Sequence, residues 1–284
     1  MAIADVEAVR VITQGFPSAS ARGTSPEFVA EELMYAIVAQ INRHPRSQQA
    51  AIGPSEVGTP CERKLGYKLL NWPEVNPKVA WKAWIGTNVH VGLAEALAAE
   101  NADTGVERYL MENTLFCGMI NGRPLFGHFD VYDRLTCGVI DWKVVGERQL
   151  RDYRANGPGP QYRAQGHLYG RGHVLKGHTV DWVGIYFLPR AGELKDAYFW
   201  HEPYDEAVAV SAIERVEAIE QWVSSTMVDN PASALKSLPT ADNYCTLCPY
   251  YKHSAKSMIE GCPGDPGAFK RKPSEPVLTF GTGK

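Results

Sequence analysis

The sequence predicts an α/β fold, a mixed sheet flanked by helices. Some segments have apolar residues at every second position, as strands do, and others have them at helical spacing. Stretches with strand character alternate with helical ones, and Asn121-Gly122 between two of the strand stretches is a typical hairpin turn. Hydrophobic residues make up 44% of the 284 residues, enough for one sizeable core and an accessory lobe. The strands are expected at 108–117, 124–133, 138–146, 179–189 and 194–202.

Three helices are expected before the first strand, and each has its own start signal. Ser25-Pro26 places a capping residue before a proline at the first helical position. Thr59 and Glu62 have the spacing of a capping box, and Asn76-Pro77 opens a longer helix. The three helices are expected at 26–43, from 59–62 onward, and at 77–100.

Two further helices are expected after the third strand. The run Gly157-Pro158-Gly159-Pro160 is a break, with a helix at 161–175 behind it. A longer helix is expected at 204–225, because apolar residues recur there at helical spacing. This apolar stripe consists of Val208, Ile213, Val216, Ile219 and Val223.

The composition divides the chain into four parts. A helical N-terminal extension at 1–50 precedes the α/β core at 51–230. After Asn230-Pro231 the composition turns to Cys, Pro, Gly and Ser, which predicts a cysteine-rich C-terminal lobe at 231–264. The remaining residues, 265–284, are expected to form a loosely ordered tail.

The net charge of −3 excludes a protein that is basic overall, so any contact with nucleic acid must be local. The stretch from Arg148 to Lys176 holds six Lys or Arg against one acid, a local net charge of +5. Because it follows the third strand directly, it is interpreted as a phosphate track. A solvated helix face is the alternative.

The N-terminus does not resemble a secretory signal, because Asp5 and Glu7 stand where such a signal is basic. No run approaches the ~20 apolar residues that a membrane-spanning helix needs. A soluble, cytoplasmic protein with no membrane partner is therefore expected. In that compartment the six cysteines should be thiols or metal ligands rather than disulfides.

A predicted hairpin places two carboxylates and a lysine together. A turn at 134–137, centred between its two middle residues, pairs Asp130 directly with Asp141. Opposed side chains in a sheet lie about 5 Å apart, which suits two carboxylates that share a cation. Lys143 is two positions from Asp141 and shares its face. The alternative is an Asp and a Lys on the solvent face of an edge strand.

Two helices add polar side chains. Gly86 would let the third helix approach another element closely, and His90 follows as a structural histidine or a metal ligand. Glu95 is a further acid on that helix. Gln165 and Tyr169 are four apart and share a helix face. They could bind a phosphate, a water or a carboxylate, or could belong to an ordinary polar helix surface.

The late cysteines indicate a second metal centre. Cys245 and Cys248 are separated by two residues, a spacing that lets two sulfurs reach one metal. Cys262 is the third ligand and Cys61 the candidate fourth, and an iron–sulfur cluster is the favoured occupant. Zinc held by His253 with the three late cysteines is one alternative, and plain thiols are another.

Together these residues resemble the RecB-like branch of the PD-(D/E)XK nuclease superfamily. The similarity is greatest to iron–sulfur exonucleases related to the CRISPR-associated Cas-four family and to the nuclease domain of AddB, many of which are phage-encoded. It covers 53–264, with an unusually long gap before Cys262 and Asp141 as the acid of the D/E-x-K motif. The residues that carry it are Cys61-Glu62-Arg63-Lys64, Tyr67, Gly86, His90, Gly127, Asp130, Asp141-Trp142-Lys143, Gln165, Tyr169, Cys245, Cys248 and Cys262.

The resemblance implies a restriction-endonuclease-like core and a Mg²⁺- or Mn²⁺-dependent deoxyribonuclease. It leans to an exonuclease on single-stranded DNA ends with 5′→3′ polarity, acting in phage recombination, replication or repair in the bacterial host cytoplasm. The metal ligands would be His90, Asp130, Asp141 and the Trp142 carbonyl. Lys143, Gln165 and Tyr169 would complete the catalytic set with the two aspartates. Cys61, Cys245, Cys248 and Cys262 would hold a 4Fe-4S cluster, and Arg63, Arg148, Arg151, Arg154 and Arg163 would contact DNA.

Two other classes stay open. One is a DNA-binding or recombination accessory protein that keeps the fold without turnover. The other is an interaction module organised by a zinc-stabilised cysteine lobe. A DNA substrate cut in the presence of Mg²⁺ or Mn²⁺ would separate the nuclease from both.

Overall fold

The computed structural model describes residues 26–44, 51–227, 230–241 and 245–265. These residues belong to two compact units, one made of 1–49 with 79–84 and the other of 50–78 with 85–284. The expected tail lies outside the described residues apart from Asp265. The expected extension at 1–50 is described only at 26–44.

The described part of the first unit is helical. Helix α2 spans Pro26–Arg43, the bounds expected from the proline at its first position. The same unit contains the first turn of α5, where Trp81 and Trp84 stack with ring centroids 5.3 Å apart.

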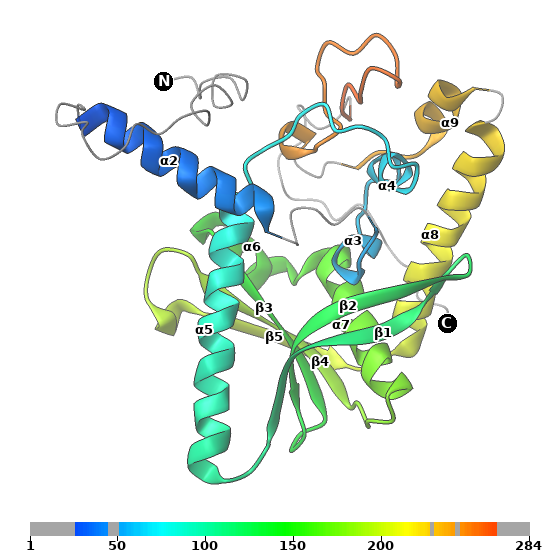
Figure 1. The fold of residues 1–284 in the computed structure, drawn as a ribbon. Helices are drawn as coiled ribbons and strands as arrows, with labels where there is room; N and C mark the ends of the chain where they lie inside the picture. The colour runs from blue at the N-terminus through cyan, green and yellow to red at the C-terminus, as the bar shows by residue number, and fades with distance from the viewer. Residues whose placement is uncertain (1–25, 45–50, 228–229, 242–244, 266–284) are drawn as a thin grey trace. The chain divides into compact units, whose positions relative to one another are not determined.

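The second unit is built on one mixed five-stranded sheet in the order β1-β2-β3-β4-β5 (Figure 1). Neighbouring strands run antiparallel except β3 and β4, which are parallel. The parallel pair needs a crossover, and α6 and α7 supply it. The strands are β1 (Tyr109–Ile120), β2 (Arg123–Asp133), β3 (Gly138–Val145), β4 (Trp182–Pro189) and β5 (Tyr198–Pro203). The predicted α/β class with a mixed sheet flanked by helices is therefore confirmed.

Helices cover both faces of this sheet (Figure 1). Helices α7 and α8 pack on one face through a core that includes Phe129, Val139, Leu168 and Val216. On the other face α5 packs against Val131 and its neighbours on β3 and β4. The helices of this unit are α3 (Pro54–Val57), α4 (Glu62–Leu69), α5 (Trp81–Thr104), α6 (Glu147–Asn156), α7 (Gly159–Leu175), α8 (Glu206–Met227) and α9 (Pro231–Ser237), with α5 continuing from the first unit.

Two predicted helix starts are wrong. Helix α4 begins at Glu62 with Cys61 as its cap, so Thr59 does not cap it. Helix α5 begins at Trp81 rather than at 77, because the Asn76 side chain is used elsewhere. Its amide donates to the carbonyls of Thr246 and Cys248 instead of capping a helix. These bonds fasten residues 245–262, which carry the three late cysteines and are called the cysteine segment below.

Two other boundaries differ from expectation. The Gly157-to-Pro160 run joins two helices, since α6 precedes it and α7 starts within it at Gly159. Gly157 and Gly159 have φ of 77° and 69°, and this left-handed backbone makes the sharp junction. The expected strand at 194–202 is shorter, because Leu194–Asp196 forms a 3-10 turn before β5.

Across the described segments, none of the helices combines the length and apolar character that crossing a membrane requires.

Candidate active site and cysteine cavity

The β2–β3 hairpin has the register expected from its turn. Val131 pairs with Ile140 and Asp133 pairs with Gly138, around the turn at 134–137. Continued by one step, this register brings Asp130 opposite Asp141. There the ladder gives way to a side-chain contact, because the Trp142 N–H donates to Asp130 Oδ2 at 2.7 Å. The two aspartates therefore lie where β2 and β3 separate.

Asp130 accepts from two directions. Its Oδ1 lies 3.1 Å from His90 Nδ1 on α5. A carboxylate can only accept, so Nδ1 carries the hydrogen, and in neutral His90 the lone pair is on Nε2. Burial alone would raise the pKa of Asp130, which is 7% exposed, but the His90 hydrogen bond and the charges of His90 and Lys143 lower it. Asp130 is therefore a buried carboxylate that stays ionised.

Asp141 is the more deeply buried acid, with 3% of its surface exposed. Lys143 Nζ forms an ion pair with its Oδ2, and Gln165 Nε2 on α7 donates to its Oδ1 at 3.0 Å. Burial raises the pKa of Asp141 to about 6 although Lys143 opposes this, and the charge of Asp130 adds to the rise. Two carboxylates with pKa values displaced in opposite directions are typical of functional sites.

Lys143 is held between the carboxylates and an aromatic ring. Its Nζ lies 5.0 Å from the centroid of the Tyr162 ring on α7, a cation–π contact. Burial alone would lower the pKa of Lys143, but Asp141 and Asp130 outweigh it and hold this pKa above its usual value. The site therefore contains a fixed ammonium group.

Helix α7 lies close to β2 because of a glycine. A Cβ at Gly127 would lie 2.8 Å from the Tyr169 ring and 2.6 Å from Pro54 of α3. Gln165 Nε2 lies 3.3 Å from the Tyr169 hydroxyl, so both predicted residues belong to the same contact. Gln165 Oε1 is buried and has no hydrogen-bond partner among the described residues. It is an acceptor that a water or a substrate group could use.

Two contacts of the site were not expected from the sequence. No role was predicted for Tyr162, although its position one turn before Gln165 indicates a shared helix face. A role was predicted for the Trp142 carbonyl, whereas the observed contact uses the Trp142 N–H. Glu95, the further acid on α5, is exposed.

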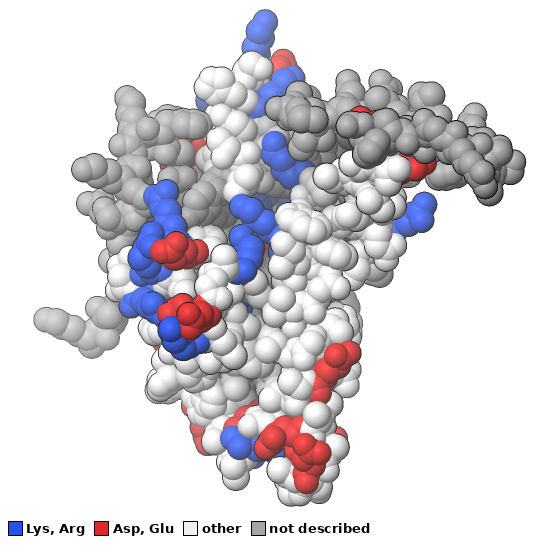
Figure 2. Space-filling view, turned by 90° about the vertical axis from the view of Figure 1, so that its left-hand side faces the viewer, with Lys and Arg blue, Asp and Glu red and all other residues white. Residues whose placement is uncertain are grey.

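The five predicted DNA-binding arginines lie in different surroundings. Arg63 is tied to the main chain, donating to the carbonyls of Leu235, Lys236 and Leu238. Arg148 on α6 is exposed. Figure 2 shows basic and acidic side chains interspersed on one face rather than a continuous basic area. Three arginines have acceptors nearby, namely Arg151 with Glu147, Arg154 with the Asp196 carbonyl, and Arg163 with Glu202.

The four cysteines of the expected cluster line one cavity. Cys61 at the start of α4, Cys245, Cys248 and Cys262 all contribute to its wall. Backbone N–H groups point at two of the sulfurs, from Gly264 to Cys262 and from Asp265 to Cys245. Burial raises the pKa of Cys248 to about 11, so without a metal it is a thiol.

His253, the zinc ligand of the alternative set, is not part of this cavity wall and contacts Tyr251. The cavity is also lined by an aromatic stack in which Tyr67 of α4 lies on Tyr250 with ring centroids 4.9 Å apart. The Tyr67 hydroxyl donates to the Met258 carbonyl at 2.6 Å. These contacts join α4 to the cysteine segment.

Both places have donors that suit a metal. The two carboxylates suit Mg²⁺ or Mn²⁺, and four sulfurs suit iron or zinc. Within the described ranges, no group of three or more His, Cys, Asp or Glu side chains is arranged to hold an ion as it stands. At the acidic site Lys143 contacts one oxygen that an ion would use.

No protein-family model matches this chain, and no curated protein matches it. Among solved structures it is similar to SSO0001, with a TM-score of 0.44 and 18% identity over 78% of this chain and 94% of that one. It is also similar to LHK-Exo, an alkaline exonuclease from Laribacter hongkongensis, with a TM-score of 0.41 and 13% identity over 64% and 96% of the two chains. LHK-Exo in complex with dAMP gives a TM-score of 0.43 and 14% identity over 67% and 96%.

Proposed function

We propose that the protein is a metal-dependent deoxyribonuclease. One observation carries this proposal: Asp130 and Asp141 meet where two strands separate, with Lys143 on one carboxylate and His90 on the other. Removing these four ionisable groups from solvent costs free energy of folding unless their charges compensate one another. Fold stability alone does not require this cost, because apolar side chains of similar size would fill the same space.

Asp130, Asp141 and His90 are the groups that would hold Mg²⁺ or Mn²⁺, and the Trp142 carbonyl is a further candidate. An ion bound there supplies neutralisation of phosphate charge and activation of a water. Lys143, Gln165 and Tyr169 would act through their own side chains rather than through the ion. Lys143 can stabilise the charge that develops on the phosphate, since its ammonium group is fixed beside the carboxylates.

Gln165 is a positioning residue. Its Nε2 holds Asp141 Oδ1, and its Oε1 faces no described partner and can accept from an incoming water. Tyr169 lies beside Gln165 and against Gly127, so it closes the α7 side of the site. The family resemblance leans to exonuclease action on single-stranded ends, with 5′→3′ polarity and a role in phage recombination or repair, and we include these details in the proposal.

We further propose that the cysteine cavity holds an iron–sulfur cluster. Support comes from the four sulfurs on one wall and the N–H groups directed at two of them. Such N–H groups stabilise a negatively charged cluster. The cluster would be structural, fastening the cysteine segment to α4.

Digestion of end-labelled single- and double-stranded DNA with Mg²⁺ and with Mn²⁺ tests the nuclease proposal. Asp130→Ala should lose cleavage, whereas Asp103→Ala, an exposed acid on α5, should retain it. Near-full activity of Asp130→Ala would show that the site is assigned to the wrong residues. Binding of DNA without cleavage under all conditions would favour the accessory protein.

A further inference from the structure

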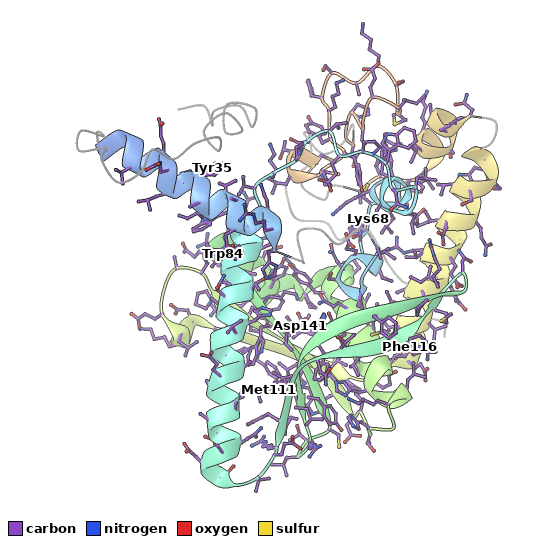
Figure 3. All side chains as sticks on the ribbon, viewed as in Figure 1. Tyr35, Lys68, Trp84, Met111, Phe116 and Asp141 are labelled. Atoms are coloured by element: carbon purple, nitrogen blue, oxygen red, sulfur yellow. The ribbon has the colours of Figure 1, made fainter. Side chains whose placement is uncertain are left out.

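An aromatic pair is exposed on the β1–β2 hairpin. Phe116 is 37% exposed and Phe126 is 51% exposed. They lie directly opposite each other in the ladder, with ring centroids 5.7 Å apart and ring planes at 62°. Figure 3 shows Phe116 on the same strand as Met111. In this edge-to-face arrangement at least one ring face is left for another planar group.

This pair lies on the strand face that contains Asp130. Gly127 and Phe129 face α7, where they meet Tyr169 and His173. Side chains alternate along 125–129, so Phe126 and His128 point to the opposite face. The contact of Asp130 with His90 of α5 places this carboxylate on that face as well. The exposed His128 is paired with Thr114, whose hydroxyl lies 3.4 Å from its ring nitrogens. A continuous row of side chains therefore leads from the exposed aromatic pair to the buried carboxylate.

We propose that Thr114, Phe116, Phe126 and His128 form a base platform, a surface on which bases of a single DNA strand stack while its phosphate is at the aspartates. This inference rests on the proposed nuclease function. Phe126 and Asp130 are four positions apart on β2, about 13 Å, which roughly four stacked nucleotides at ~3.4 Å each would span. Aromatic rings bind bases without regard to sequence, because every base has a π-face.

A purely structural role for the pair is the competing explanation. Cross-strand aromatic pairs stabilise a hairpin, and that contribution needs only apolar contact. Leucine at both positions keeps apolar contact across the strands but has no π-face. Replacement of both residues by Leu therefore separates base stacking from hairpin stability.

The test is binding of oligothymidylate and of an abasic strand of the same length, by fluorescence anisotropy without Mg²⁺ or Mn²⁺. The wild type should bind oligothymidylate more tightly than the abasic strand. The Phe116→Leu/Phe126→Leu variant should bind oligothymidylate on the order of tenfold more weakly than the wild type does. The affinity for the abasic strand should not change. The Phe116→Tyr/Phe126→Tyr variant should keep the preference for the strand with bases, because tyrosine also has a π-face. Thermal unfolding of each variant monitors the hairpin.

Four outcomes would overturn the inference. Equal affinity of the wild type for both strands would show that bases are not bound. Equal loss for both strands in the Leu variant would indicate a structural role. If the wild type cuts DNA and the Leu variant binds and cuts it equally well, the platform proposal is wrong but the nuclease proposal stands. A wild type that neither binds nor cuts DNA removes both.

Discussion

Lys143 and Asp141, two positions apart on β3, form an ion pair in which both side chains are shielded from solvent. The pair is local in sequence, yet its surroundings come from α7 and β2. Because Asp141 is buried and Lys143 is largely shielded, loss of either charge leaves the other uncompensated.

Lys143→Ala is therefore expected to have two effects. DNA cleavage should fall about a hundredfold or more, as for the loss of a transition-state charge stabiliser. The free energy of unfolding should fall by about 3 kcal/mol, because Asp141 loses its partner. Asp141→Asn/Lys143→Met should recover stability but not activity. End-labelled digestion and urea unfolding measure both effects, with Lys195→Ala, at an exposed lysine, as the matched control. Unchanged cleavage would contradict the assignment.

His173 should make the protein less stable in acid. Burial lowers the pKa of His173 to about 3, and its ring packs against those of Tyr132 and His178. The unfolded chain takes up a proton near pH 6.5 and the folded chain does not, so unfolding is favoured as pH falls below that value. The loss should approach about 1.4 kcal/mol per pH unit. Chemical denaturation across this range should show a weaker pH dependence for His173→Phe. Equal slopes for both proteins would contradict the prediction.

The cysteine cavity predicts a coloured protein. Anaerobic purification should yield iron and sulfide with broad visible absorption. Cys61→Ser and Cys262→Ser should lose iron, because both sulfurs line the cavity. His253→Ala should retain it, and Cys117→Ser, at a buried cysteine in β1, is the control for the substitution itself. Stoichiometric zinc that depends on His253 would support the alternative ligand set.

Loss of Arg63 should affect stability, whereas loss of Arg148 should affect DNA binding. Arg63→Ala should lower stability by about 2 kcal/mol, since three main-chain carbonyls lose a charged donor. Arg148→Ala should leave stability unchanged, weaken DNA binding and reduce its salt dependence, because Arg148 is an exposed side chain. Urea unfolding and DNA titrations over a range of salt concentrations measure the two effects. If Arg148→Ala binds DNA like the wild type, the phosphate track is wrong at this residue.

Local spacing alone determined much of this protein. Period-two patterns located five strands, and the turn at 134–137 set the register that brings Asp130 opposite Asp141. These features depend on neighbours in the sequence, so the sequence alone was enough to predict them.

Tertiary structure decided the rest. Nothing near Arg63 in the sequence indicates that its guanidinium binds the α9 carbonyls, because those acceptors lie far along the chain. Local spacing does not predict the meeting of Gln165 with Asp141 or of Cys61 with the late cysteines either. Those were expected from the family resemblance and from the need for a fourth ligand, and packing produces the contacts. A long side chain can satisfy its donors in many ways, and only the packing of helices against the sheet selects one of them.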